Sequence, residues 1–308
     1  MRLSEKDWQE ALSGKYQGEA LFGIAMKDLT SLGIGGPADV MATPQDPLSL
    51  RNLLVILKDR GIPFFALGWG TNILVRDRGI EGVVISLKAF DRIEVLHEGS
   101  RHAELFVEAG VPLQKLVNFC REKGYSGIEG LTGIPGTVGG AIRGNAGSFG
   151  CEIKDVLLSV AIIDSTGRLD RFKAEGLGFG YRKSDILQTD IILSANLKLN
   201  KDEKEAVSGR TEAFFAEKKT SQPISEKSAG CVFKNPGGAS AGRLIDEAGC
   251  KGMKAGGIEV SSLHANFFIN RGGGTASDYL ELMERVISAV QIKSGIVLEP
   301  EIRIVGRA

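Results

Sequence analysis

The chain has 308 residues, more than a single hydrophobic core ordinarily serves, so two or three domains are expected. Its 38 basic and 38 acidic residues balance to a formal net charge of zero without a basic stripe, which argues against a nucleic-acid-binding surface. Four cysteines without C-x-x-C spacing and three histidines without an H-E-x-x-H pattern argue against a disulfide framework and predict no metal site.

The beginning of the sequence reads MRLSEKDWQEALSG, which is charged where a secretory signal peptide requires an apolar stretch. Nowhere do about eighteen apolar residues follow one another, as a membrane-spanning helix would require. We therefore expect a cytoplasmic protein that does not associate with membranes.

Residues 37–88 alternate between short apolar runs and one helical segment. Strands are predicted over residues 38–42, 64–67 and 83–87, and a helix is predicted over residues 47–60. Gly61 ends this helix, and Pro63 prevents it from continuing. The pattern is typical of a βαβ unit.

The next region predicts a mixed α+β structure. A helix over residues 112–123 is closed by Gly124. Strands are expected over residues 92–96, 104–109, 156–164 and 191–199, with a turn at residues 165–167.

The composition changes after Asn200, because residues 201–220 are charged and helical in character, which predicts a domain boundary. A helix over 240–248, a strand over 265–270, a helix over 275–294 with one apolar face and a last strand over 297–305 are expected beyond it. We expect three domains, at residues 1–90, 91–204 and 205–298, with a strand within 299–308 that returns to the first.

Residues 131–150 read LTGIPGTVGGAIRGNAGSFG and contain seven glycines. Glycine permits positive φ angles and close approach of the backbone to a ligand, so amide groups in such a segment can face an anion or a flat ring. The apolar Ile134, Val138, Ala141 and Ile142 distinguish it from a flexible linker, which remains the alternative. We interpret the segment, called the glycine cluster below, as a cofactor-binding loop.

A second glycine-containing segment, GWGTNILV at residues 68–75, follows a predicted strand. It fails the dinucleotide fingerprint G-x-G-x-x-G because Ile73 stands at the third glycine position, and the chain contains no P-loop. Its successive amides predict a nest for a pyrophosphate, with an ordinary tight turn as the alternative. Ser148 lies in AGSFG, which lacks the first glycine of a nucleophile elbow and the strand before it, so serine hydrolysis is disfavoured.

Six segments occur in a specific order along the chain: GGPAD (35–39), GWGTNILV (68–75), GIPGTVGGAIRGNAGSFG (133–150), YRKS (181–184), SAGCVFKNP (228–236) and LEPEIR (298–303). With this order and spacing the chain resembles the UDP-N-acetylenolpyruvoylglucosamine reductases, also called UDP-N-acetylmuramate dehydrogenases, which are flavoproteins of peptidoglycan synthesis. Each segment alone is a weak signal, but the six together cover nearly the whole chain.

The resemblance implies an α+β fold in which a two-part FAD-binding unit of the vanillyl-alcohol-oxidase type precedes an α+β substrate-binding domain. In this chain the two FAD-binding subdomains would be residues 1–90 and 91–204, and the substrate-binding domain would be residues 205–298. It implies reduction of UDP-N-acetylglucosamine enolpyruvate to UDP-N-acetylmuramate by a monomer, with NADPH as co-substrate. Hydride would pass from flavin N5 to C3 of the enolpyruvyl group, and a proton would reach C2. Because neither glycine-containing segment has a histidine, FAD is expected to be held noncovalently.

The resemblance also implies which residues bind FAD. They are Gly68, Trp69, Gly70, Thr71, Asn72, Ile73, Leu74, Gly133, Thr137, Val138, Gly139, Gly140, Ala141, Asn145, Ala146 and Gly147.

By the same resemblance, Arg182 and Glu301 match charge-stabilising positions and Cys231 matches the proton donor. Many relatives have serine where this chain has Cys231, but a thiol with a reference pKa of about 8.5 is a reasonable general acid. From the residues alone, Arg182 can also belong to a solvated turn, and Cys231 can be a small buried apolar residue. Glu301 can form an ion pair with Arg303, two residues along a predicted strand.

Tyr181, Lys234, Asn235 and His264 are expected to contact the substrate, with Asn266 as a further polar residue of the pocket wall. The longer form of the family closes a tyrosine-bearing loop over the UDP part. This chain has no tyrosine in that stretch and resembles the shorter form. A flavin oxidase acting on another substrate and a noncatalytic flavin-binding or nucleotide-sugar-binding protein remain the alternatives.

Overall fold

The structure is a computed structural model that describes residues 5–14 and 16–308. The first four residues of the segment in which we expected no signal peptide lie outside these ranges. The chain divides into two compact units, each made of three stretches. Unit 1 comprises Met1–Phe22, Val40–Gly68 and Gly82–Ala216, and unit 2 comprises Gly23–Asp39, Trp69–Glu81 and Glu217–Ala308. The three domain ranges expected from the sequence stay a prediction.

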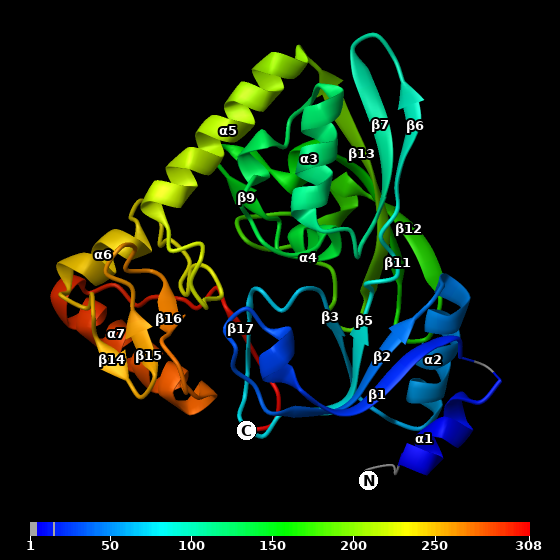
Figure 1. Cartoon of the computed structure of the whole chain (residues 1–308), viewed down its shortest axis with the longest axis horizontal. Coiled ribbons are helices and arrows are strands. Elements are labelled where there is room, and N and C mark those ends of the chain that lie inside the picture. The colour runs from blue at the N-terminus through cyan, green and yellow to red at the C-terminus, as the bar shows by residue number, and fades with distance from the viewer. Residues whose placement is uncertain (1–4, 15) are drawn as a thin grey trace. The chain divides into compact units, whose positions relative to one another are not determined.

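The helices and strands can be followed in Figure 1. The α-helices are α1 (Glu5–Leu12), α2 (Pro47–Asp59), α3 (Leu113–Lys123), α4 (Val138–Arg143), α5 (Lys204–Ser221), α6 (Ala241–Glu247) and α7 (Ala276–Ser294). The strands of the first half are β1 (Gly18–Ala25), β2 (Pro37–Pro44), β3 (Phe64–Leu67), β4 (Ile73–Val75), β5 (Ile80–Ser86), β6 (Ile93–Glu98), β7 (His102–Glu108), β8 (Tyr125–Ser126), β9 (Gly147–Ser148) and β10 (Cys151–Glu152). The later strands are β11 (Leu157–Ile163), β12 (Leu169–Lys173), β13 (Ile191–Lys201), β14 (Lys254–Ala255), β15 (Ile258–Val260), β16 (Phe268–Asn270) and β17 (Arg303–Val305).

A four-stranded sheet in the order β1-β2-β5-β3 occupies the N-terminal part of the chain. The β3 and β5 strands run parallel, with Phe64 opposite Val83, and α2 lies between β2 and β3 in the sequence. The apolar side of α2 is fully buried at Leu50, Leu53 and Leu57, and each such side chain contributes about 1.5–3 kcal/mol to stability. The predicted strands and helix of the βαβ pattern are confirmed, whereas β1 was not predicted.

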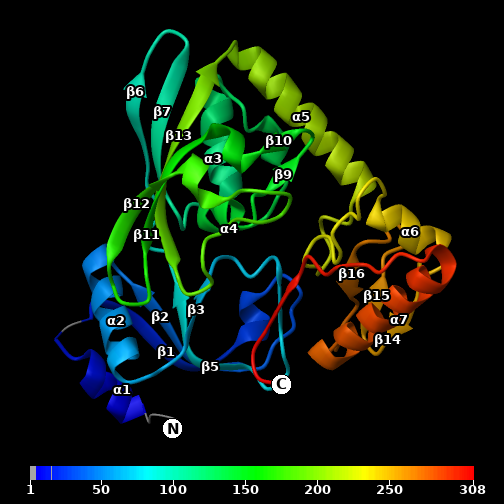
Figure 2. The ribbon, with the colours of Figure 1, turned by 180° about the vertical axis from the view of Figure 1, so that it is seen from behind.

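A six-stranded antiparallel sheet forms the larger part of unit 1, in the order β12-β11-β13-β7-β6, with β8 added beside β13. Helices α3 and α4 pack on this sheet, and both views in Figures 1 and 2 show them beside β13 and β7. Buried side chains from the sheet and both helices form one core, including Leu105, Leu116, Ile142 and Leu197. Gly124 ends α3 in the left-handed conformation, with φ 69°, as the sequence predicted.

Unit 2 contains a parallel pair formed by β4 and β17, a three-stranded sheet in the order β14-β15-β16, and helices α6 and α7. Thr275 begins α7 with a capping box, and Gly295 ends it with φ 74°. The buried face of α7 includes Leu282, Val286 and Val290, in agreement with the predicted apolar face.

Two predicted strands of unit 2 are shorter in the structure. The strand expected over 265–270 covers Phe268–Asn270, and the strand expected over 297–305 covers Arg303–Val305. The residues before each strand instead form single bridges, Cys231 with Phe267 and Phe233 with Pro300. In the part of the chain that the structure describes, no helix is both long enough and apolar enough to cross a bilayer.

Candidate active site

The glycine cluster contains a short helix, α4, where the sequence predicted only a loop. The Thr137 side chain caps α4 by accepting a hydrogen bond from the Gly140 amide at 3.3 Å, and Val138, Ala141 and Ile142 are buried. A Cβ atom on Gly139 would lie 2.9 Å from the Cβ of Ala109. Glycine at this position therefore lets α4 pack closely against the segment that contains Ala109.

The two segments predicted to bind FAD meet inside unit 1 at Gly68 and Thr137. A Cβ atom on Gly68 would lie 2.9 Å from the Thr137 Oγ1 atom, so any side chain there would displace the cap of α4. A Cβ atom on Gly140 would meet only Thr137 Oγ1, at 3.5 Å. Bare backbone at these glycines fits the close approach of a pyrophosphate or a flavin ring.

Asn145, Phe149 and Arg182 have positive φ angles of 43°, 52° and 55°, and no other non-glycine residue among those described does. All three belong to unit 1. A side chain in this conformation costs about 1–3 kcal/mol and persists only where its surroundings enforce it. Strained residues of this kind are often found at functional sites. In unit 1 they lie in the glycine cluster and in the YRKS segment.

Direct hydrogen bonds join the glycine cluster to the segment that carries Arg182. The Asn145 Nδ2 atom donates to the Gly180 carbonyl at 3.0 Å, and Arg182 Nη1 donates to the Gly147 carbonyl at 2.8 Å. The Arg182 guanidinium also lies 5.5 Å from the ring centroid of Tyr181. The YRKS segment is thus fixed to the predicted cofactor-binding loop and is not an independent solvated turn.

In unit 2, Cys231 and Glu301 lie on neighbouring segments of chain. Cys231 forms an antiparallel bridge with Phe267, and the next residue, Val232, accepts a hydrogen bond from the Glu301 amide at 2.8 Å. The buried side chain of Asn266 brackets this segment, because it accepts from the Phe233 amide at 2.9 Å and donates to the Phe233 carbonyl at 2.7 Å. A main-chain framework therefore sets the spacing of the thiol and the carboxyl group.

The later residues of GWGTNILV belong to the same framework in unit 2. Asn72 donates from Nδ2 to the Glu301 carbonyl at 3.4 Å, and its own carbonyl accepts from the Arg303 amide at 3.2 Å. Ile73 and Leu74 pair with β17 through Arg303 and Ile304.

The turn before Asn72 is tightly packed. Gly70 has φ 62°, and a Cβ atom there would lie 2.2 Å from the Leu29 carbonyl oxygen. The Gly70 carbonyl accepts from the Ser31 amide at 3.1 Å, so this turn is held by main-chain contacts of unit 2.

The other residues predicted to contact the substrate have structural contacts of their own. Tyr181 belongs to unit 1 and is half exposed, whereas Lys234, Asn235 and His264 belong to unit 2. Lys234 forms an ion pair with Glu299, and the Asn235 Oδ1 atom accepts from the Ala241 amide at 2.9 Å. Their role toward a substrate stays a prediction.

His264 lies in a turn against an aromatic ring. Its Nδ1 atom accepts from the Asn266 amide at 3.2 Å, and its ring meets the Phe267 ring edge-on at 4.9 Å. Burial lowers the pKa of His264, which favours the neutral imidazole. Among the residues that the structure describes, no three His, Cys, Asp or Glu side chains are grouped as a metal site would require.

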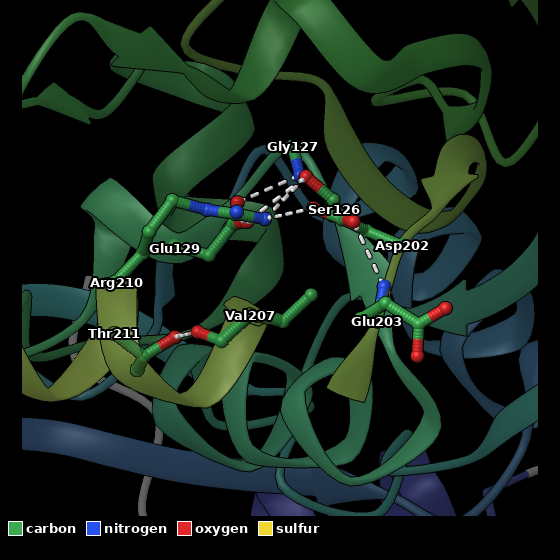
Figure 3. Close-up of polar contacts among 8 residues, drawn as sticks. All are labelled: Ser126, Gly127, Glu129, Asp202, Glu203, Val207, Arg210 and Thr211. Atoms are coloured by element: carbon green, nitrogen blue, oxygen red, sulfur yellow. Dashed lines mark hydrogen bonds and ion pairs between the residues drawn. The ribbon is translucent and has the colours of Figure 1, made fainter. Parts of the chain in front are cut away.

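Sequence reasoning missed a polar cluster that holds the chain just before the glycine cluster (Figure 3). The buried Glu129 carboxylate accepts from Arg210 Nη2 at 2.8 Å, from Ser126 Oγ at 2.9 Å and from the Gly127 amide at 2.7 Å. Arg210 lies on α5 and also bonds Asp202 at 2.7 Å. No sequence signal reveals this cluster, because Glu129 and Arg210 are 81 residues apart.

Two known protein families match successive parts of the chain. The family described as FAD binding domain matches residues 38–173, and the C-terminal domain of UDP-N-acetylenolpyruvoylglucosamine reductase matches residues 222–305. The UDP-N-acetylenolpyruvoylglucosamine reductase of Geotalea uraniireducens (strain Rf4) is 41% identical across 97% of this chain and 98% of its own length. The protein of that name from Geobacter sulfurreducens is 43% identical across 96% and 97%.

Solved structures agree with these matches. The crystal structure of UDP-N-acetylenolpyruvylglucosamine reductase from Thermus caldophilus is 38% identical, with a TM-score of 0.80 over 94% of this chain and 98% of that one. A berberine bridge enzyme, 16% identical with a TM-score of 0.50 over 65% of this chain and 44% of its own, shows a shared fold alone. The expected α+β fold, with an FAD-binding domain before the C-terminal domain of the reductases, is confirmed. The chain therefore belongs to the UDP-N-acetylenolpyruvoylglucosamine reductase family, and its FAD-binding domain makes it an FAD-dependent oxidoreductase, as the sequence predicted.

Proposed function

We propose that this protein reduces UDP-N-acetylglucosamine enolpyruvate to UDP-N-acetylmuramate, with NADPH as the reductant, in peptidoglycan synthesis. The observation that carries the proposal is the similarity to named reductases across 97% of the chain, which includes both the FAD-binding part and the C-terminal domain. The proposal places the protein in the cytoplasm as a monomer.

When bound, FAD accepts a hydride from NADPH and supplies a hydride to C3 of the enolpyruvyl group. The main chain at residues 68–74 and 133–147 would hold the cofactor without a covalent bond. Support comes from Gly68, where a side chain would displace the Thr137 cap, and from Gly140, where the nearest atom to an added Cβ is Thr137 Oγ1 at 3.5 Å. The substrate side chains in this proposal are Tyr181, Lys234, Asn235 and His264.

Arg182 would stabilise the charge that develops during the reaction. Arrival of a hydride at C3 leaves negative charge at C2, shared with the carboxylate of the enolpyruvyl group. A fixed cation beside that carboxylate lowers the barrier most when it needs no reorientation. The support is the enforced backbone conformation of Arg182 and its hydrogen bond to Gly147.

Cys231 would donate the proton that C2 requires. A thiol has a reference pKa of about 8.5, so it gives up its proton far more readily than an alcohol. Glu301 would act beside it, either by orienting the substrate carboxylate or by ordering the proton donor. The support is the hydrogen bond between the Glu301 amide and Val232, the residue after Cys231.

The absorption spectrum and the stoichiometry of NADPH oxidation test this function. The purified protein is expected to show a flavin spectrum and to oxidise one NADPH for each molecule of UDP-N-acetylglucosamine enolpyruvate consumed. A colourless protein after incubation with FAD would refute the proposal. Oxygen consumption with an alcohol or a lactone would indicate a flavin oxidase, and flavin without turnover of any of these compounds would indicate a noncatalytic binding protein.

A further inference from the structure

Arg143, the last residue of α4, binds three main-chain carbonyl groups of one segment. Its Nη1 atom donates to the Ile186 carbonyl at 3.3 Å and to the Leu187 carbonyl at 2.8 Å, and Nη2 donates to the Asp190 carbonyl at 2.5 Å. Only arginine offers several donors in a planar fork, so no other side chain can reproduce this set. The guanidinium therefore fixes the main-chain conformation of residues 186–190.

The main chain of Arg143 and the side chain of Asn145 hold the other end of the same segment. The Arg143 carbonyl accepts from Ser184 Oγ at 2.8 Å, and Asn145, with no exposed surface, donates to the Gly180 carbonyl at 3.0 Å. The segment 180–190 is therefore bound at both ends by the stretch 143–147. All of these residues belong to unit 1.

Arg182 lies inside this doubly held segment. Its φ of 55° is unfavourable for a residue with a side chain, so the conformation must be imposed by contacts on both sides. A bridge between Gly180 and Lys183 forms the tight turn around it. The contacts that can impose this turn include Asn145 before it and Ser184 and Arg143 after it. The Asp185 amide also donates to the Leu177 carbonyl, at 2.9 Å.

We propose that Arg143 is a positioning residue for Arg182: its guanidinium fixes residues 186–190, just after the turn, so that the Arg182 guanidinium is held in place before substrate arrives. The inference rests on the proposed function, in which Arg182 stabilises charge on the enolpyruvyl group. Displacement of a catalytic group by about 1 Å can slow a reaction by about 10²-fold. Arg143 itself need not touch the cofactor or the substrate.

The hydrogen bonds from the Arg143 guanidinium to residues 186–190 are called the clamp below. Amide hydrogen exchange in the cofactor-free protein tests the clamp without relying on catalysis. In the wild-type protein, the amides of Lys183, Asp185 and Asp190 are bonded within the protein. Arg143→Met should speed exchange over residues 178–190 by about tenfold or more, because opening of this segment becomes easier. Arg168→Met, at an exposed arginine paired with Asp170 in the same unit, is the matched control and should leave exchange over 178–190 unchanged.

Single-turnover kinetics of the flavin-loaded protein test the link to Arg182. Arg143→Met should slow flavin reoxidation by UDP-N-acetylglucosamine enolpyruvate by about 10- to 100-fold, and flavin reduction by NADPH should change by less than about twofold. Arg143→Lys, which keeps the charge but not the fork, should fall between Met and the wild type. Arg143→Met added to Arg182→Met should cause no further slowing, since both substitutions remove the same function, charge stabilisation by Arg182.

Unchanged exchange over residues 178–190 in Arg143→Met would overturn the clamp. Multiplicative effects of the two methionine substitutions would show that Arg143 acts independently of Arg182, which also overturns the inference. Should Arg143→Met fail to fold, the same two measurements on Arg143→Lys decide the question. A wild-type protein whose flavin is not reoxidised by the substrate would refute the proposed function, and the exchange experiment would still decide whether Arg143 holds the segment.

Discussion

The guanidinium of Arg210 binds the carboxylate of Glu129 through two nitrogens, Nη2 at 2.8 Å and Nε at 3.0 Å, both to the same Oε1 atom (Figure 3). Glu129 is buried, and Arg210 belongs to the part of α5 that lies in unit 1. The chain leads from Glu129 through Gly130 directly into the glycine cluster. A Cβ atom on Gly130 would lie 2.4 Å from the Ser148 carbonyl oxygen, so this turn also packs directly on the cluster.

Glu129→Gln is expected to lower the free energy of unfolding of the cofactor-free protein by about 1–3 kcal/mol. The reason is that the buried donors around Glu129 would then face a neutral amide in place of a negatively charged carboxylate. Chemical denaturation at pH 7 measures this change. Glu247→Gln is the matched control, since Glu247 pairs with Arg243 at an exposed site on α6, and its effect should stay below about 1 kcal/mol. Equal effects of the two substitutions would show that the Glu129 cluster contributes no more than a surface ion pair.

The pH dependence of stability should differ between wild type and Glu129→Gln. Burial by itself raises the pKa of Glu129, but hydrogen bonds from the Gly127 amide, Arg210 and Ser126 outweigh it, so this pKa lies below its usual value. The stabilisation from ionised Glu129 is therefore fully present above the unfolded-state pKa of about 4.3 and is lost as the pH falls through the lower folded-state pKa. Denaturation midpoints between neutral and acidic pH should converge for the two proteins, and parallel curves would contradict this assignment.

Gly139→Ala and Gly140→Ala should change stability in opposite directions. Both glycines lie in α4, where alanine ordinarily stabilises a helix by about 0.5–1 kcal/mol. A Cβ at Gly139 meets Ala109 at 2.9 Å, and such overpacking costs about 1–3 kcal/mol. At Gly140 the nearest atom is at 3.5 Å, so we expect a more stable cofactor-free protein.

Titration with FAD completes the comparison of these two variants. If the backbone of Gly140 approaches the cofactor, Gly140→Ala should bind FAD at least about tenfold more weakly although it is the more stable protein. Unchanged FAD affinity in Gly140→Ala would remove Gly140 from the proposed cofactor-binding residues.

Arg182→Gly should be more stable than Arg182→Ala by about 1 kcal/mol, because only glycine adopts a φ of 55° without steric cost. Both variants should lose most of the reoxidation rate with substrate, since neither has a cation. The two measurements are the free energy of unfolding and the rate of flavin reoxidation. A fully active Arg182→Gly would show that the strained arginine is not needed for catalysis.

Cys231→Ala should slow substrate reduction by about 10²- to 10⁴-fold and leave flavin reduction by NADPH intact, as expected for removal of a general acid. Cys231→Ser should keep substantial activity, because a hydroxyl can donate a proton from the same position. Stopped-flow absorbance separates the two half-reactions. Equal slowing of both half-reactions in Cys231→Ala would contradict the proton-donor assignment. An inactive Cys231→Ser variant would show that the thiol has another role.

The sequence by itself determined the elements whose signals are local. Gly124 ends α3 and Gly295 ends α7, both with positive φ, because glycine adopts this conformation without cost. The apolar spacing of α7 predicted its buried face. The order of six short segments was sufficient to identify the family, and the family implied both the cofactor and the candidate catalytic residues.

Only the tertiary structure decided how these candidates are held. It placed a helix in the glycine cluster, set Gly68 against Thr137, and gave Arg182 its left-handed backbone. The partners of Arg143 are carbonyl groups 43, 44 and 47 residues away. Every residue type has a carbonyl group, so a contact of this kind leaves no pattern in the sequence, and the fold alone brings its two ends together.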